Sequence, residues 1–138
     1  MRRAENLRVV EFAMQIAELT YSATRAFPAD ERFGLVSQMR RAAVSIGSNI
    51  AEGCGRSSAA QFAHFIQMAT GSASELEYQA RLSERLAFGD AGDLAQLRAL
   101  IQNERRMLAK LVERRRDSSR FPKSEAATPP MRAEKRGA

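Results

Sequence analysis

The 138-residue sequence predicts an all-α protein, an antiparallel up-and-down four-helix bundle. Four segments carry apolar residues at steps of three and four, the spacing that places side chains on one face of a helix. Short breaks with proline, glycine or aspartate separate these segments, and the alternation typical of a strand is absent. Only 7% of residues are aromatic and Trp is absent, so the core must be aliphatic and alanine-rich, which favours helices.

The first helix is expected over residues 5–26. It ends at Phe27, because a residue that precedes a proline is pushed out of the helical region. Residues at helical spacing form its expected core face: Val9, Phe12, Ala13, Ile16, Thr20, Ala23 and Phe27.

The second helix is expected to begin near residues 31–33 and to run to about residue 52. Gly53 and Gly55 would then close it in the left-handed conformation that glycine adopts easily. On a helical wheel, the face toward the core holds Leu35, Met39, Ala42, Ile46 and Ile50. A second, polar face holds Gln38, Arg41, Ser45, Asn49 and Glu52.

The third helix follows at once, and Ser58 with Gln61 has the spacing of a capping box at its start. Its apolar face runs from Phe62 to about residue 87. The segment FGDAGD makes the next break, with Asp90 or Asp93 as the N-cap of a fourth helix over residues 94–116. Four residues of that helix are expected to face the core: Leu97, Ile101, Leu108 and Leu111. Leu100 and Met107 flank them.

The chain is expected to divide into a helical domain over residues 1–117 and a basic, disordered tail over residues 118–138. The tail is rich in Ser, Pro, Lys, Arg and Ala and lacks apolar periodicity. From residue 114 onward, eight basic and three acidic residues contribute +5 of the net charge of +6. The body therefore carries little net charge, which weakens any argument from total charge to a nucleic-acid-binding body.

A row of small residues, Ala43, Gly47 and Ala51, marks a third face of the second helix. A solvent-exposed face would be charged, and Gly47 costs about 1 kcal/mol relative to Ala in a helix interior. Two readings remain open. Either this helix is the most buried helix of a monomer, or the row is a subunit interface.

The polar face of the second helix predicts a network of hydrogen bonds and ion pairs. Arg41, Asn49, Glu52 and Arg56 would meet Glu75 or Glu77 of the third helix. Buried charges must be paired to be tolerated, so a structural role is the simpler reading. A role in contacting a ligand is the alternative.

Catalytic, metal and cofactor sites are not expected. The single histidine, His64, follows Gln61, so one subunit cannot supply the paired Glu-x-x-His motifs of a di-metal bundle. The single cysteine, Cys54, has no second cysteine to resolve it and fits a reducing, cytoplasmic compartment. No apolar run approaches the length that spans a membrane, and no signal peptide is recognised.

The motif FPADERFGLVSQMRRAAVSIGSNIAEGCGRSSAAQF at residues 27–62, followed by GSASELE at residues 71–77, resembles a known family. It is similar to the four-helix-bundle proteins encoded by intervening sequences within bacterial 23S rRNA genes. The resemblance covers roughly residues 7–111. Gly47 stands where the family usually has proline, and Val10 where it often has tryptophan.

The resemblance implies a bundle that assembles as a ring-shaped homopentamer, in a family whose biochemical role is poorly defined. It also implies a relation to the accessory variability determinant proteins of diversity-generating retroelements. Those form basic pentameric barrels that bind nucleic acid and a partner reverse transcriptase. By analogy, this chain would bind nucleic acid or partner such an enzyme.

Two functions are therefore predicted for a protein that is not an enzyme. The first is an oligomeric interaction scaffold, with a second copy and another protein as partners. The alternative is electrostatic, sequence-nonspecific RNA or DNA binding, without base stacking, because no row of aromatic residues suits it. The candidate phosphate contacts are Arg40, Arg41, Arg56, Arg106 and Lys110.

Overall fold

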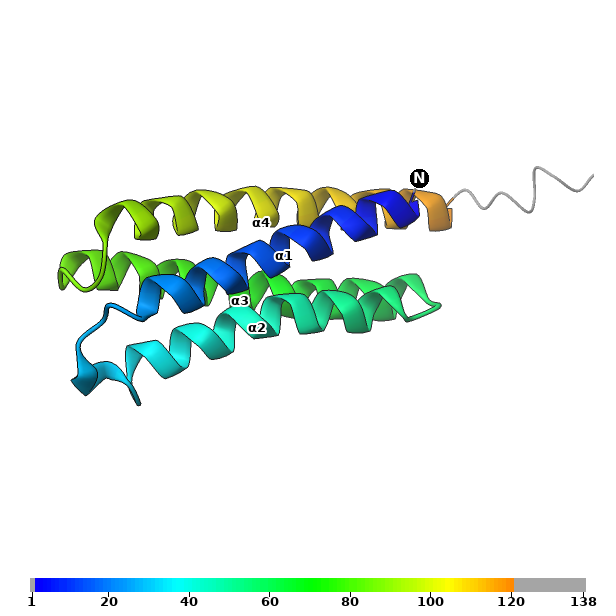
Figure 1. Ribbon diagram of the computed structural model, residues 1–138. Helices are drawn as coiled ribbons and strands as arrows, with labels where there is room; N and C mark the ends of the chain where they lie inside the picture. The colour runs from blue at the N-terminus through cyan, green and yellow to red at the C-terminus, as the bar shows by residue number, and fades with distance from the viewer. Residues whose placement is uncertain (1, 121–138) are drawn as a thin grey trace, which may run out of the picture.

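The computed structural model describes the backbone of residues 2–120, in which four α-helices and one 3₁₀ turn occur and no strand (Figure 1). The all-α prediction is confirmed. Most of the predicted tail, residues 121–138, lies outside the described residues. The elements are α1 (Arg2–Thr24), η1 (Ala29–Glu31), α2 (Leu35–Cys54), α3 (Ala59–Arg85) and α4 (Ala91–Arg120).

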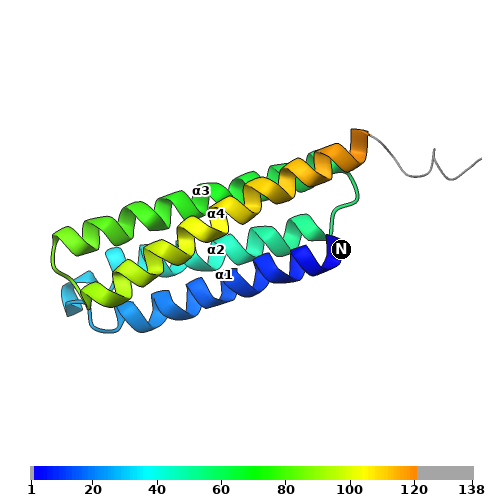
Figure 2. The same ribbon diagram turned by 90° about the horizontal axis from the view of Figure 1, so that it is seen from above.

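The four helices run up and down around one core (Figure 2). Each helix packs against two others: α1 and α3 occupy opposite corners of the bundle, and α2 and α4 occupy the other two. An ion pair between Glu5 and Arg114 joins the start of α1 to the last turns of α4. None of the helices within residues 2–120 is long and apolar enough to cross a membrane.

Most residues of the predicted apolar stripes form the core, but Phe12 is only partly buried and lies outside it. Alanines make up a large part of it, and they let the helices approach closely. The largest fully buried apolar side chains come from all four helices: Ile16, Met39, Ile46, Ile50, Phe62, Ile66, Leu76, Leu94, Leu97, Ile101 and Leu108.

The end of α1 is held by two buried threonines. The hydroxyls of Thr20 and Thr24 donate to the carbonyl oxygens of Ile16 and Thr20, each at 2.7 Å. The chain leaves the helix after Thr24, and Phe27 turns back into the bundle. Its ring lies 5.7 Å from the ring of Phe88, between centroids, so these two rings close this end of the core.

The start of α2 lies later than predicted, at Leu35. Residues before it form η1 instead of an α-helical turn. Glu31 Oε1 accepts a hydrogen bond from the Leu35 backbone N–H at 3.1 Å, so the glutamate satisfies a free donor of the first turn of α2.

The predicted left-handed closure of α2 is wrong. Gly53 lies inside the helix, and Gly55 has an ordinary φ of −85°. Gly53 is required by space, because a Cβ there would lie 2.9 Å from the Cβ of Phe65 in α3. Left-handed geometry occurs instead between α3 and α4, at Ala87 (φ 57°) and Gly89 (φ 71°).

The predicted start of α3 is confirmed, because Ser58 Oγ accepts a hydrogen bond from the Gln61 backbone N–H at 3.0 Å. At the start of α4, Asp90 Oδ2 accepts from the Asp93 backbone N–H at 2.9 Å, so Asp90 is the capping residue. The helix begins at Ala91, three residues before the predicted start.

Alanine at Gly47 and at Gly53 should change stability in opposite directions. A Cβ at Gly47 would lie 3.5 Å from the Ala13 Cβ, an ordinary contact, so Gly47→Ala should raise the free energy of unfolding by about 0.5–1 kcal/mol. Gly53→Ala should lower it by about 1–3 kcal/mol, because Phe65 must move.

Urea unfolding followed by circular dichroism measures both changes. Gly71→Ala is the matched control for helix propensity within one chain, because a Cβ there meets nothing within 4 Å of its own chain. The comparison is made at a protein concentration at which the chain sediments as a monomer. Destabilisation of equal size at Gly47 and Gly53 would contradict this account of the helix spacing.

Candidate functional site

Arg40 is fixed at the junction of α1 and α2. Its Nε–H donates to Thr24 Oγ1 at 2.9 Å, and one of its terminal nitrogens donates to the Tyr21 carbonyl oxygen at 3.2 Å. The guanidinium carbon lies 4.5 Å from the centre of the Tyr21 ring. Arg41, the next residue, is exposed, and it forms no ion pair with any described residue.

The other candidate cations lie elsewhere. Arg56, at the far end of α2, pairs with Glu52 and lies 4.9 Å over the Phe65 ring. Arg106 is exposed on α4 and donates to Asn103 Oδ1 at 3.2 Å. Lys110, one turn further along α4, is also exposed. Because α2 and α4 occupy opposite corners, the fold does not gather the five candidates into one patch.

The predicted polar network is divided between separate places. Asn49 Nδ2 donates to the carbonyl and hydroxyl oxygens of Ser45, and the Ser45 hydroxyl bonds that of Ser72 on α3 at 2.9 Å. Glu75 accepts a hydrogen bond from Gln79, one turn away on its own helix. Among the described residues, neither Glu75 nor Glu77 pairs with α2, and Glu77 pairs with α4 instead.

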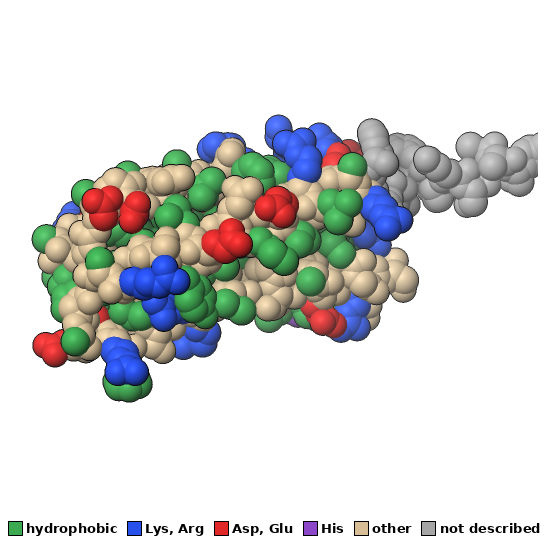
Figure 3. Space-filling view, in the orientation of Figure 1, with side chains coloured by type: hydrophobic (Ala, Val, Ile, Leu, Met, Phe, Trp, Pro, Cys, Tyr) green, Lys and Arg blue, Asp and Glu red, His purple; other side chains and the backbone are tan. Residues whose placement is uncertain are grey.

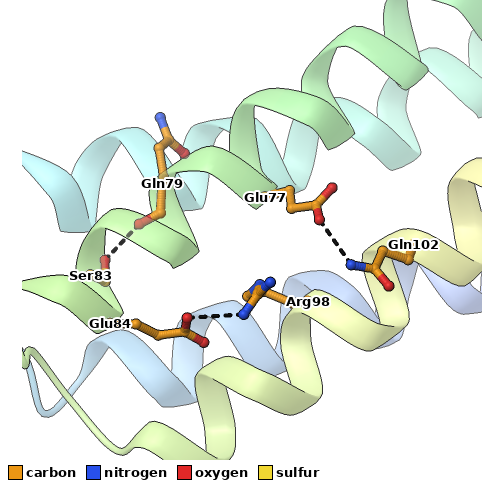
Figure 4. A network of polar contacts seen from close by, with 6 residues as sticks. All are labelled: Glu77, Gln79, Ser83, Glu84, Arg98 and Gln102. Carbon is orange, nitrogen blue, oxygen red and sulfur yellow. Dashed lines mark hydrogen bonds and ion pairs between the residues drawn. The ribbon is translucent and has the colours of Figure 1, made fainter.

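Ion pairs between α3 and α4 form a network that the sequence did not indicate (Figure 4). Glu77 accepts hydrogen bonds from Gln102 and Arg105, each at 3.0 Å. These partners lower the pKa of the Glu77 carboxyl, the Gln102 hydrogen bond most. Arg98 donates to Glu84 at 3.0 Å. Since every member faces another helix of the same chain, this network holds the bundle together.

The small-residue row of α2 lies against α1. Ala43 is buried within its own chain, and Gly47 lies beside Ala13. Ala51, at the end of the row, is exposed. The row therefore explains the close approach of α1 and α2, and only its exposed end is open to a contact from outside the chain.

A shallow groove runs along the outer side of the α1–α2 junction, and we call it the basic groove. Lys and Arg side chains gather over the start of α2 in Figure 3. Three arginines, two aromatic rings, two valines and three serines line the groove, and no acidic residue does: Tyr21, Arg32, Phe33, Val36, Ser37, Arg40, Arg41, Val44, Ser45 and Ser48.

Sequence reasoning missed Tyr21, Arg32 and Phe33 as members of a common surface. Tyr21 belongs to α1, whereas the other two lie just before α2. A signal for Phe33 existed, because it lies outside the core spacing of the second helix and next to an arginine. Nothing in the sequence places Tyr21 beside Arg40, since that contact depends on how α1 and α2 pack.

Glu104 is a second residue that the sequence analysis missed. It lies on α4 with its side chain 0% exposed, and neither carboxyl oxygen has a hydrogen-bond partner among the described residues. Burial raises the pKa of Glu104 to about 8, and no nearby charge opposes the shift. The signal was its position between Ile101 and Leu108, in the inward stripe of α4.

The remaining reactive side chains do not form a chemical site. Burial raises the pKa of the Cys54 thiol, and Arg115 opposes this only partly, so the reactive thiolate is disfavoured. His64 is exposed and packs edge-on against the neighbouring Phe65 ring. Among the described residues, no group of three His, Cys, Asp or Glu side chains could hold a metal ion.

Comparisons with known proteins agree with the fold. A family model described as 23S rRNA-intervening sequence protein matches residues 5–110. A crystal structure of a protein of unknown function from the S23 ribosomal protein family of Bacteroides thetaiotaomicron has a similar fold, with a TM-score of 0.66 and 23% sequence identity. The alignment covers 82% of this chain and 99% of that one. A search of curated proteins gives no match.

The buried carboxyl of Glu104 should make stability depend on pH. The protonated form is favoured in the folded chain, so stability is full below the unfolded-state pKa of 4.5 and falls as the pH rises toward about 8. The expected slope is up to about 1.4 kcal/mol per pH unit. Glu104→Gln, which mimics the neutral acid, should remove this slope.

Urea unfolding at pH values across that range measures the effect. Glu113→Gln is the matched control, because Glu113 lies on the same helix and is exposed, and it should keep the wild-type slope. Identical slopes in the wild type and in Glu104→Gln would show that Glu104 does not titrate in this range.

Proposed function

Because the chain belongs to the family of 23S rRNA-intervening sequence proteins, whose fold is shared and whose activity is unassigned, we propose that it is a non-enzymatic, self-assembling interaction scaffold. The chemistry of the described residues supports this reading. The single thiol is held in its unreactive form, and the buried acid Glu104 lies in the core rather than in a cleft.

A second apolar stripe on α1 is the observation that carries the proposal. Four residues alternate at steps of three and four along one side of the helix: Leu7, Val10, Met14 and Ala17. Val10 and Ala17 are partly buried against the core, whereas Leu7 is 63% and Met14 58% exposed. Such spacing is typical of a seam between packed helices, and Leu7 and Met14 form its uncovered part within the described chain. We call this surface the α1 stripe.

The opposite corner of the bundle carries a second apolar surface, on α3. Tyr78 is 66% exposed there, and Met68 is also exposed. Gly71 lies between them, and a Cβ at that position would meet nothing within 4 Å. A glycine in the interior of a helix costs about 1 kcal/mol, and contacts within the chain do not explain it. We call this surface the α3 patch.

Two different surfaces on opposite corners favour a head-to-tail contact between subunits. A contact that joins unlike surfaces closes into a ring when the rotation between subunits permits. The α1 stripe of one subunit against the α3 patch of the next would therefore give a ring, in line with the predicted homopentamer. The number five follows from the family resemblance rather than from these surfaces.

Binding of nucleic acid is the second candidate function. The specific observation in its favour is the basic groove, whose lining contains three arginines and no acidic residue. In a ring, each groove would be present once per subunit, so weak contacts would add through multivalency. By the analogy drawn from the sequence, such a module would partner a nucleic-acid enzyme such as a reverse transcriptase.

Mixing two assembly-defective variants tests the head-to-tail contact. Met14→Glu disables the α1 stripe and Tyr78→Glu disables the α3 patch, so each variant alone should sediment as one chain. Each variant keeps the surface that the other lacks, so their mixture should form a species of two chains and no larger one. Analytical ultracentrifugation measures the masses, and circular dichroism verifies the helical fold.

Conservative variants are the controls for this experiment. Met14→Leu and Tyr78→Phe keep both surfaces apolar and should assemble like the wild type. A wild-type mass of one chain would remove the self-assembly proposal. Assembly of the wild type combined with a mixture that stays monomeric would reject the head-to-tail contact. Assembly of one of the two variants on its own would also reject it and would favour a contact between like surfaces.

A further inference from the structure

We propose that the basic groove binds single-stranded nucleic acid, with phosphates on its arginines and bases stacked on its exposed rings. This inference deepens the second candidate function, and it rests on the groove rather than on self-assembly. It differs from purely electrostatic binding, because it assigns part of the affinity to aromatic side chains at named positions.

The charge of the groove is the first argument. Arg32, Arg40 and Arg41 line it, no acidic residue does, and none of the three forms an ion pair within the described chain. Four arginines elsewhere in the described chain do pair with glutamates, among them Arg98 and Arg105, which pair with α3. Three guanidiniums without an acidic partner, one just before α2 and two on it, attract a chain of anions.

The geometry of Arg40 is the second argument. Hydrogen bonds to Thr24 Oγ1 and to the Tyr21 carbonyl oxygen hold its guanidinium over the Tyr21 ring. These bonds use the single N–H of Nε and one N–H of a terminal nitrogen. The other N–H groups of the guanidinium remain able to donate to a ligand. The cation and the ring are therefore positioned before a ligand arrives, which lowers the entropic cost of binding.

The exposure of Phe33 is the third argument. Its side chain is 88% exposed, and the guanidinium carbon of Arg32 lies 5.5 Å from the ring centre. Burial in the core does not account for this ring, because it lies outside the core cluster. Aromatic rings and guanidinium planes are the surfaces on which unpaired bases stack.

A single strand fits this surface better than a duplex or an acidic peptide. A duplex keeps its bases stacked on one another and offers no free face to Phe33. A peptide needs deep pockets for its anchoring side chains, and the groove is shallow. The lining residues on α2, from Val36 to Ser48, extend over about 18 Å at 1.5 Å per residue, enough for a few nucleotides.

Fluorescence anisotropy of the full-length chain with labelled oligouridylate, about twelve nucleotides long, tests the inference across a salt series. An RNA duplex of the same length should bind more weakly. Phe33→Leu should weaken binding about tenfold through lost stacking, and Phe33→Tyr should retain the affinity. Arg41→Gln should weaken binding and lower the salt slope by about 0.7.

Arg85→Gln is the matched control, because it removes the same charge from an exposed arginine outside the groove. It should change the affinity by less than about twofold. The basic segment beyond residue 120 is present in every variant, so differences between variants report on the groove.

Three results would overturn the inference, and each has a separate meaning. If the wild type binds neither the single strand nor the duplex, both the second candidate function and the assignment of the groove as its site are rejected. If it binds RNA but the Phe33 and Arg41 variants behave like Arg85→Gln, nucleic-acid binding occurs elsewhere on the chain. If poly-glutamate binds in a manner sensitive to Phe33→Leu while oligouridylate does not bind, the groove takes an acidic protein.

Discussion

Gly47 lies against Ala13, and Gly53 lies against Phe65, so α2 contacts both of its neighbours at positions that have no side chain. On α3 the small residues Ala69 and Ala73 are fully buried, so this helix also contacts its neighbours through short side chains. Because these residues fill little volume, the helices approach closely and the core is thin. A thin core cannot take every large apolar side chain, and several of them, on α1 and on α3, remain on the outside.

Glu104 shows that the core is also not fully apolar. A carboxyl occupies a core position of α4, without a partner, where an apolar residue would stabilise the bundle more. Burial keeps it neutral near physiological pH, at a cost in free energy that grows as it ionises. In the proposed ring, burial of the α1 stripe and the α3 patch would offset part of that cost, because association stabilises the folded subunit.

Arginines serve two purposes in this chain, and the fold separates them. Those of α4 bind partners inside the molecule: Arg98 and Arg105 pair with α3, and Arg114 pairs with α1. Those near the start of α2 border the basic groove and have no acidic partner there. The high pI therefore sums cations with different surroundings, and it does not by itself locate the charge that a ligand would meet.

The sequence by itself determined the helices and their inward faces. Apolar residues repeated every three to four positions form one face of a helix, and four such helices joined by short loops bury these faces together in an antiparallel bundle. It also indicated Ser58 as a cap, since that signal is local. Only the tertiary structure decided which partners long side chains meet. Glu77 faces α4 rather than α2, the small row faces α1, and Tyr21 meets Arg40, because these contacts depend on helix rotation and register, which periodicity leaves free.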